Sequence, residues 1–190
     1  KGWWALPSMA SPRLLAAAMR LPNGRVLVTG GYKATLPFEQ NSSEVYDPVT
    51  NTWSAGPNMT KSRYEHSVTK LLDGKFLLVA SHIDSANVFA SEYFDPATNA
   101  YTALPNLTFN HARRGATLLG DGRVLISGGG NIEKTVELFA FAANGQSCTI
   151  AADCKSGHCV EGVCCTSACG GTCQSCLGAK TGAVNGTCAP

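Results

Sequence analysis

Asn23-Gly-Arg-Val-Leu-Val-Thr-Gly-Gly31 is a turn dipeptide followed by a hydrophobic run, and this stretch occurs three times in the chain. The other copies are Asp73-Gly-Lys-Phe-Leu-Leu-Val-Ala80 and Asp121-Gly-Arg-Val-Leu-Ile-Ser-Gly-Gly129. Asn-Gly and Asp-Gly favour type I′ turns, so each copy predicts a tight hairpin. The apolar run that follows predicts an inner strand covered on both faces.

Further strands recur around each hairpin. A third, half-exposed strand is predicted at Ser43–Pro48, Ser91–Pro96 and Thr135–Phe139. A fourth strand is predicted at Asn51–Ala55 and Asn99–Leu104, and a first strand begins at Arg13, His66 and Gly115. Four strands in about 50 residues make one propeller blade, so the sequence predicts an all-β fold with three blades of four antiparallel strands.

The last blade has no fourth strand of its own. Trp3-Trp-Ala-Leu-Pro7 is similar to Trp53-Ser-Ala-Gly-Pro57 and Tyr101-Thr-Ala-Leu-Pro105, so we expect it to pair into the last blade. Three blades are too few for a ring. We therefore expect either a piece of a longer propeller, which we favour, or a homo-oligomer of two chains that completes the ring.

The combination of Arg13 or Arg63, the hairpin, Gly-Gly, Glu-x-Tyr-Asp-Pro and Trp53 resembles the kelch repeat of galactose-oxidase-like bacterial propellers. The resemblance covers roughly residues 3–140. The second copy departs from the pattern at Val79-Ala80-Ser81, where the double glycine is lost, and the third has His111 in the Arg position.

Composition divides the chain near Phe141. All the aromatic residues lie at or before Phe141, so residues 1–141 are predicted to form the blades. Residues 142–190 contain all nine cysteines among small polar residues, and a segment this short without aromatic residues needs staples to fold. We therefore predict a disulfide-rich, loop-dominated module stapled by Cys148, Cys154, Cys159, Cys164, Cys165, Cys169, Cys173, Cys176 and Cys188.

The module around Ala152-Asp-Cys-Lys-Ser-Gly-His-Cys-Val-Glu-Gly-Val-Cys-Cys165 resembles cysteine-rich repeats that follow kelch propellers in secreted proteins of predatory soil bacteria. A metal site is the alternative, but only Cys173 and Cys176 have zinc-knuckle spacing, with His158 the sole nearby histidine. Nine is an odd number, so one cysteine pairs beyond Pro190, pairs with another chain or stays a free thiol.

Net charge, apolar runs and cysteines argue against some classes of partner and indicate the compartment. The net charge is +2, without a run of Lys or Arg, which argues against nucleic-acid binding and a polybasic membrane anchor. The apolar runs are strand-sized, so we expect no transmembrane segment. Disulfides indicate an oxidising compartment, and we predict a secreted or cell-surface chain whose secretion signal has been removed or lies upstream.

The resemblance to galactose oxidase implies a copper site with Tyr and His ligands and a Tyr–Cys crosslink. No cysteine precedes Cys148, so we expect no such cofactor here, and we predict no catalytic, cofactor or metal residues. His66 is interpreted as a packing residue rather than a metal ligand. Trp3, Trp4, Trp53 and Tyr101 are interpreted as inter-blade core rather than sugar platforms.

The remaining polar candidates give a possible ligand-facing rim, made of His82, Asp84, Arg63, Arg113 and Arg114. The alternative for the arginines is that they hold blade geometry through hydrogen bonds to backbone. The leading hypothesis is an extracellular interaction protein that binds a protein or glycan at the cell surface. The alternatives are a fragment of a secreted carbohydrate-active or oxidase enzyme and a structural subunit of an extracellular assembly.

Overall fold

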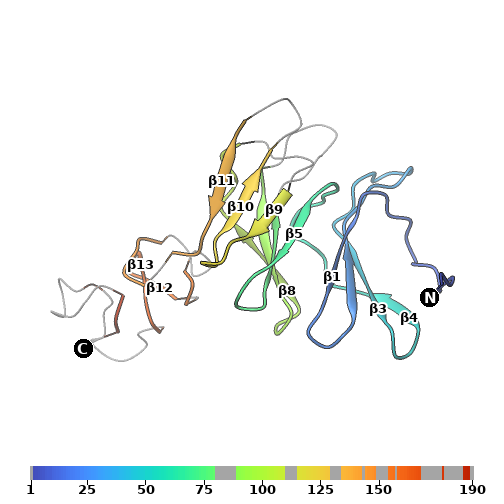
Figure 1. Ribbon diagram of the computed structural model, residues 1–190, viewed down its shortest axis with the longest axis horizontal. Coiled ribbons are helices and arrows are strands. Elements are labelled where there is room, and N and C mark those ends of the chain that lie inside the picture. The colour runs from blue at the N-terminus through green and yellow to red at the C-terminus, as the bar shows by residue number, and fades with distance from the viewer. Residues whose placement is uncertain are drawn as a thin grey trace. The chain divides into compact units, whose positions relative to one another are not determined.

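The computed structural model describes residues 2–79, 89–109, 115–128, 134–142, 144–148, 154–156, 158–167, 177 and 186–188 (Figure 1). These residues form strands and turns and contain no helix, as the all-β prediction requires. Within the same ranges, no helix is long and apolar enough to cross a membrane.

Three antiparallel sheets follow one another along the chain, each with its strands in sequence order. Blade 1 contains β1 (Ala17–Arg20), β2 (Val26–Thr29), β3 (Ser43–Asp47) and β4 (Thr52–Ala55). Blade 2 contains β5 (Ser67–Lys70), β6 (Phe76–Val79), β7 (Ser91–Asp95) and β8 (Ala100–Leu104). Blade 3 contains β9 (Gly115–Leu118), β10 (Val124–Ser127) and β11 (Val136–Phe139). The prediction of four strands is confirmed for two blades, and the third has three among the described residues.

The hairpins differ from the predicted type I′ turn. Gly24 has a φ of 86°, whereas Asn23 is not among the residues with positive φ. The Gly24 amide donates to Leu21 and the Leu21 amide donates to Arg25, which makes a three-residue loop. Its glycine provides the left-handed conformation of a glycine bulge. The type I′ prediction was wrong: all three hairpins close a three-residue loop in which the glycine alone has a positive φ, although Pro22, Leu72 and Gly120 differ at the first loop position.

The N-terminal segment does not supply a strand to blade 3. Residues 2–9 contain no strand, and the Trp3 side chain is fully exposed. The segment is held to blade 1 instead, where Trp53 Nε1 donates to the Pro7 carbonyl at 2.8 Å. The predicted ring-closing pairing is therefore wrong for this chain, because side-chain bonds to blade 1 replace a strand ladder.

The core lies between the faces of successive blades. Leu27 of blade 1 and Phe94 and Leu78 of blade 2 are fully buried in one cluster between blades 1 and 2. On the opposite face of blade 2, Thr69 Oγ1 donates to the Ala116 carbonyl of blade 3 at 3.2 Å. Strand β6 is buried at all four positions, whereas β2 and β10 are each buried at two. Blade 2 is thus covered on both faces.

The cysteine-rich region forms a separate, loop-dominated module. Its hairpin pairs β12 (Cys159–Val160) with β13 (Val163–Cys164), and Glu161 and Gly162 between them both have positive φ, as in a type I′ turn. Two disulfides, Cys148–Cys159 and Cys154–Cys164, fix this hairpin to the preceding chain. Backbone contacts divide the chain into two compact units, Lys1–Leu138 and Phe139–Pro190. The predicted boundary after Phe141 lies three residues further on.

Candidate functional site

Arg13, at the start of blade 1, is buried in an ion pair. Its Nε donates to Glu44 Oε1 at 3.1 Å, and its Nη1 donates to the carbonyls of Gly30 and Ser42, both at 2.8 Å. The Glu44 carboxylate also accepts from the backbone amides of Ala10 and Ser11. One carboxylate and one guanidinium therefore fasten the chain segment that leads into the blade.

Arg63 repeats this arrangement in blade 2. Arg63 and Glu92 are both fully buried, and Arg63 Nη2 lies 2.7 Å from Glu92 Oε1. Burial lowers the pKa of Arg63, and the charge of Glu92 opposes that effect. Glu92 also accepts from the backbone amide and the hydroxyl of Thr60. The prediction that Arg63 belongs to a ligand-facing rim was wrong, because a fully buried, paired guanidinium has no access to a ligand.

Glu137 occupies the same position in the third strand of blade 3. Its carboxylate accepts from the backbone amides of Thr108 and Phe109, at 2.7 and 3.5 Å. A glutamate in each third strand therefore anchors the segment that precedes each blade. The recurrence of Glu44, Glu92 and Glu137 in one repeat position is the sequence signal for this structural role.

His66 lies buried at the start of blade 2, against blade 1. A Cβ placed on Gly30 would come within 2.9 Å of His66 Cε1, so the missing side chain of Gly30 makes room for the imidazole. Burial and the positive charge of Arg63 lower the pKa of His66 to about 3, so the ring is neutral. This position favours the packing role over a metal site.

Four members of the predicted rim, His82, Asp84, Arg113 and Arg114, lie outside the described residues, as does His111. Their role remains a prediction. A different part of blade 1 provides an exposed rim that the sequence did not indicate. Leu14 and Tyr32 exchange backbone hydrogen bonds of 2.8 Å in both directions, and Tyr32 also bridges Glu39, so a small ladder extends beyond the sheet.

Apolar side chains cover this rim. Tyr32 stacks on Phe38, with 5.7 Å between ring centroids, and lies 5.3 Å from the ring of Tyr64. Leu14, Leu15 and Leu36, in the same two chain segments as the ladder, are exposed. Leu15 has a φ of 58°, a strained conformation for a residue with a side chain, and its carbonyl accepts from the Glu65 amide of blade 2. We call Leu14, Leu15, Tyr32, Leu36 and Phe38 the blade 1 rim.

The sequence misassigned part of this rim for an identifiable reason. Leu14 and Leu15 were expected in the first strand, which in the structure begins only at Ala17. The missed signal was the Leu36-Pro37-Phe38 run, an apolar segment placed in a connection rather than in a strand.

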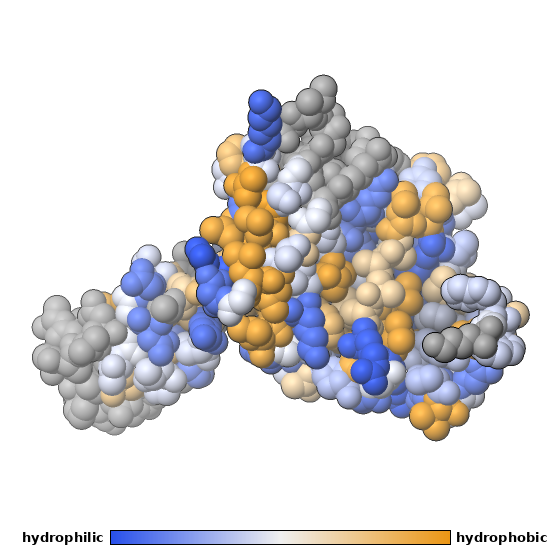
Figure 2. All heavy atoms as spheres, in the orientation of Figure 1, coloured by the Kyte–Doolittle hydropathy of each residue, from blue (hydrophilic) through white to orange (hydrophobic). Residues whose placement is uncertain are grey.

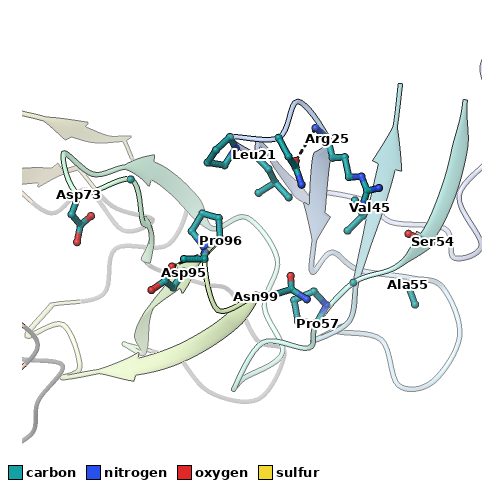
Figure 3. Close-up of a pocket in the computed structure, with 15 residues that line it drawn as sticks. Leu21, Arg25, Val45, Ser54, Ala55, Pro57, Asp73, Asp95, Pro96 and Asn99 are labelled. Carbon is teal, nitrogen blue, oxygen red and sulfur yellow. Dashed lines mark hydrogen bonds between the residues drawn. The ribbon is translucent and has the colours of Figure 1, made fainter. Parts of the chain in front are cut away.

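A groove of about 540 Å³ lies between blades 1 and 2, at the end that carries the hairpin turns (Figure 3). Blade 1 contributes the β1–β2 turn and the end of β4, and blade 2 contributes the β5–β6 and β7–β8 turns. Asp73 and Asp95 lie on the blade 2 side, and Arg25 lies on the blade 1 side. The lining also includes Leu21, Pro22, Asn23, Val45, Ser54, Ala55, Pro57, Pro96 and Asn99.

The cysteines are the other predicted site residues. Among the described residues, the one cluster with metal-ligating atoms is Cys148, Cys154 and Cys159, and all three are in disulfides. Cys165 and Cys188 are also disulfide-bonded. Cys169, Cys173 and Cys176 lie outside the described residues, so the fate of the ninth cysteine stays a prediction.

Comparison with known proteins agrees with this architecture. A family model for the kelch motif matches residues 14–60, which span blade 1 and the connection to blade 2. Blade 1 is therefore similar to a kelch repeat. Of the curated proteins, an F-box/kelch-repeat protein of Arabidopsis thaliana is 46% identical over 52 residues, which are 27% of this chain and 15% of that protein.

Among solved structures, a copper-bound fungal alcohol oxidase of the AA5 family superposes with a TM-score of 0.53 at 18% identity. The match covers 62% of this chain and 27% of the oxidase. At that identity the likeness shows the propeller fold alone. The chain thus spans about a quarter or less of the length of either relative.

Proposed function

We propose that this chain is an extracellular recognition scaffold, in which the kelch blades hold the blade 1 rim rigid for contact with a partner protein. The observation that carries the proposal is the rim itself. Its backbone is fixed by the Leu14–Tyr32–Glu39 ladder, while Leu36 at its tip is 77% exposed. An exposed apolar group on an ordered backbone loses little entropy on binding, and such surfaces are typical of interaction sites.

The buried charges support a scaffold role. Arg13, Arg63, Glu44 and Glu92 are all used to fasten the blades, so their charges are not available for chemistry on a substrate. The disulfides of the cysteine-rich module favour an oxidising, extracellular location. The module would then serve as a compact, protease-resistant spacer.

The rim is tested by photo-crosslinking. A photoreactive amino acid replaces Leu36 in one sample and Val49 in a control; Val49 is even more exposed than Leu36 but lies in the β3–β4 turn. Both proteins are incubated with the secreted and surface fraction of the source cells. We expect a defined protein adduct from position 36 only, competed by the unlabelled chain but not by its Leu14→Ser/Leu36→Ser variant. The same adducts from both positions, or adducts to glycan alone, would contradict the proposal.

A second proposal concerns assembly. The outer face of blade 3 exposes Val136 and Leu138 at 54% and 50%, and Figure 2 shows hydrophobic residues gathered over β10 and β11. We infer that another kelch blade, from a second copy of this chain or from a longer polypeptide, covers this face. Light scattering of the purified chain distinguishes the sources: a dimer supports the second copy, and a monomer contradicts it.

A further inference from the structure

The groove between blades 1 and 2 is open because of one residue difference between repeats. In blade 2, Leu72 lies over the next turn, with Cδ1 3.0 Å from the position that a Cβ on Gly122 would occupy. In blade 1 the same position is Pro22, and nothing lies within 4 Å of a Cβ placed on Gly74. The shorter proline ring therefore leaves the space beside Gly74 unfilled.

The polar groups of blade 2 around this groove lack the partners that their blade 1 equivalents have. In blade 1, Asp47 pairs with Arg25 at 2.9 Å. The equivalent carboxylate in blade 2, Asp95, accepts from the Ala97 amide, and among the described residues it has no cationic partner. Lys75, which stands in the repeat position of Arg25, pairs with Asp73 instead.

Asn99 shows the same difference. Its blade 1 equivalent, Asn51, accepts a hydrogen bond from the Tyr46 hydroxyl at 2.7 Å. Blade 2 has Phe94 in place of Tyr46, so there is no equivalent hydroxyl to donate to the side-chain oxygen of Asn99. An unneutralised carboxylate and a free side-chain amide thus face one groove.

The floor of the groove is apolar. Leu21 is buried, and Val45, Pro57 and Pro96 are partly buried beside it. Figure 3 shows Leu21 and Pro96 between the Arg25 side and the carboxylates of Asp73 and Asp95. Arg25 is already held by Asp47, so the charge left at the blade 2 end is negative.

These features fit one kind of ligand. We propose that the groove binds an arginine side chain in an extended segment of a partner protein. The aliphatic part of arginine covers apolar surface while its guanidinium reaches an acceptor. The planar guanidinium group donates two parallel hydrogen bonds to one carboxylate, here that of Asp95. The side-chain oxygen of Asn99 accepts a further hydrogen bond beside it. A volume of about 540 Å³ is within the range of ligand pockets and exceeds what one side chain needs, so flanking residues also fit.

This site is independent of the blade 1 rim. The groove is lined by the β1–β2, β5–β6 and β7–β8 turns and by the end of β4, whereas the rim is built on the β2–β3 connection and the segment before β1. Either surface can therefore fail its test without affecting the other.

The test is an NMR titration of the full, isotope-labelled chain. The probe is acetyl-Ala-Arg-Ala-amide, and the control peptide carries citrulline, which has the shape of arginine without its charge. We expect the arginine peptide to shift the amides of Gly74 and residues 95–99 and to leave Leu14 and Tyr32 unchanged. Equal shifts with citrulline, shifts outside the groove, or no shift up to the solubility limit would overturn the proposal.

Three variants sharpen the result. Asp95→Asn keeps the acceptor for the Ala97 amide but removes the charge, and we expect affinity to fall at least about tenfold. Pro22→Leu places a side chain over Gly74 as Leu72 lies over Gly122, so it should fill the groove and abolish binding.

Asp121→Asn, which changes the exposed carboxylate of the third hairpin turn, is the matched control and should bind as the wild type does. If Asp121→Asn weakens binding as much as Asp95→Asn, the effect is one of net charge and the site assignment is wrong. Dispersed spectra of each variant show that it is folded.

Discussion

Blades 1 and 2 place the same kind of aromatic pair in two different environments. Tyr46 and Trp53 of blade 1 have ring centroids 5.2 Å apart, and Phe94 and Tyr101 of blade 2 have theirs 4.9 Å apart. Phe94 is fully buried, whereas both blade 1 rings stay partly exposed. The difference arises because this face of blade 2 packs on blade 1, so a neighbouring blade decides the burial.

The hydrogen bonds of these aromatic residues also differ between the two blades. The Tyr101 hydroxyl donates to Thr29 Oγ1 of blade 1 at 3.0 Å, and burial raises the pKa of Tyr101 to about 12. Trp53 donates only to the N-terminal segment. Blade 2 is therefore the structural centre of the three-blade unit, and the faces of blades 1 and 3 are open to partners.

The largest expected effect comes from the buried ion pair of blade 2. Arg63→Met leaves Glu92 charged in a fully buried site, and we expect the free energy of unfolding to fall by roughly 3–5 kcal/mol. Urea denaturation followed by circular dichroism measures this loss. Arg63→Met/Glu92→Leu should recover part of it, because no buried charge then remains. A loss below about 1 kcal/mol for the single variant would show that the pair is solvated.

The next effect concerns pH. The folded chain keeps His66 neutral down to a pKa of about 3, whereas an unfolded chain protonates it below its usual 6.5. The unfolded state therefore binds the extra proton as the pH falls, and stability decreases. Between pH 6.5 and 5 we expect a loss of about 2 kcal/mol in urea denaturation.

His66→Ala is the control for this pH effect, because blade 1 has Ala16 in the same repeat position. The variant should lose most of the slope between pH 6.5 and 5, where the exposed Asp47 and Asp121, whose pKa values are lowered, do not titrate. An unchanged slope would assign the pH dependence to other groups.

The smallest expected change in stability comes from Tyr101 and Trp53, which stand in the same repeat position of the fourth strands. Tyr101→Phe removes the bond to Thr29 at the inter-blade contact, and we expect a loss of about 1 kcal/mol. Trp53→Phe removes an exposed bond to the N-terminal segment, and the change should stay within about 0.5 kcal/mol. Equal losses in thermal denaturation would contradict the proposed difference between the blades.

The repeats made much of this architecture predictable. The second strands, such as Val26–Thr29 and Phe76–Val79, were located from the hairpin glycine and the apolar run, because both are local features. The burial of Arg63 was not local. It depends on Glu92, which another strand brings within 2.7 Å, and an isolated arginine is ordinarily expected at the surface.

The candidate binding surfaces were harder to predict. The groove exists because Pro22 does not reach Gly74 as Leu72 reaches Gly122, and that contact depends on how two blades pack. The rim depends on Leu14 and Leu15 leaving the strand that their apolar character suggests. Both features follow from packing between repeats, which spacing alone does not describe.

Hydrogen exchange of the intact chain tests the central claim that blade 2 is covered on both faces while blades 1 and 3 are each open on one. Exchange monitored by NMR at each amide compares β6 with β2 and β10, the same strand in the three blades. We expect the amides of Phe76–Val79 to exchange most slowly, since β6 is buried at all four positions. If the amides of Val26–Thr29 or Val124–Ser127 exchange as slowly as those of β6, the account of one covered and two open blades is wrong.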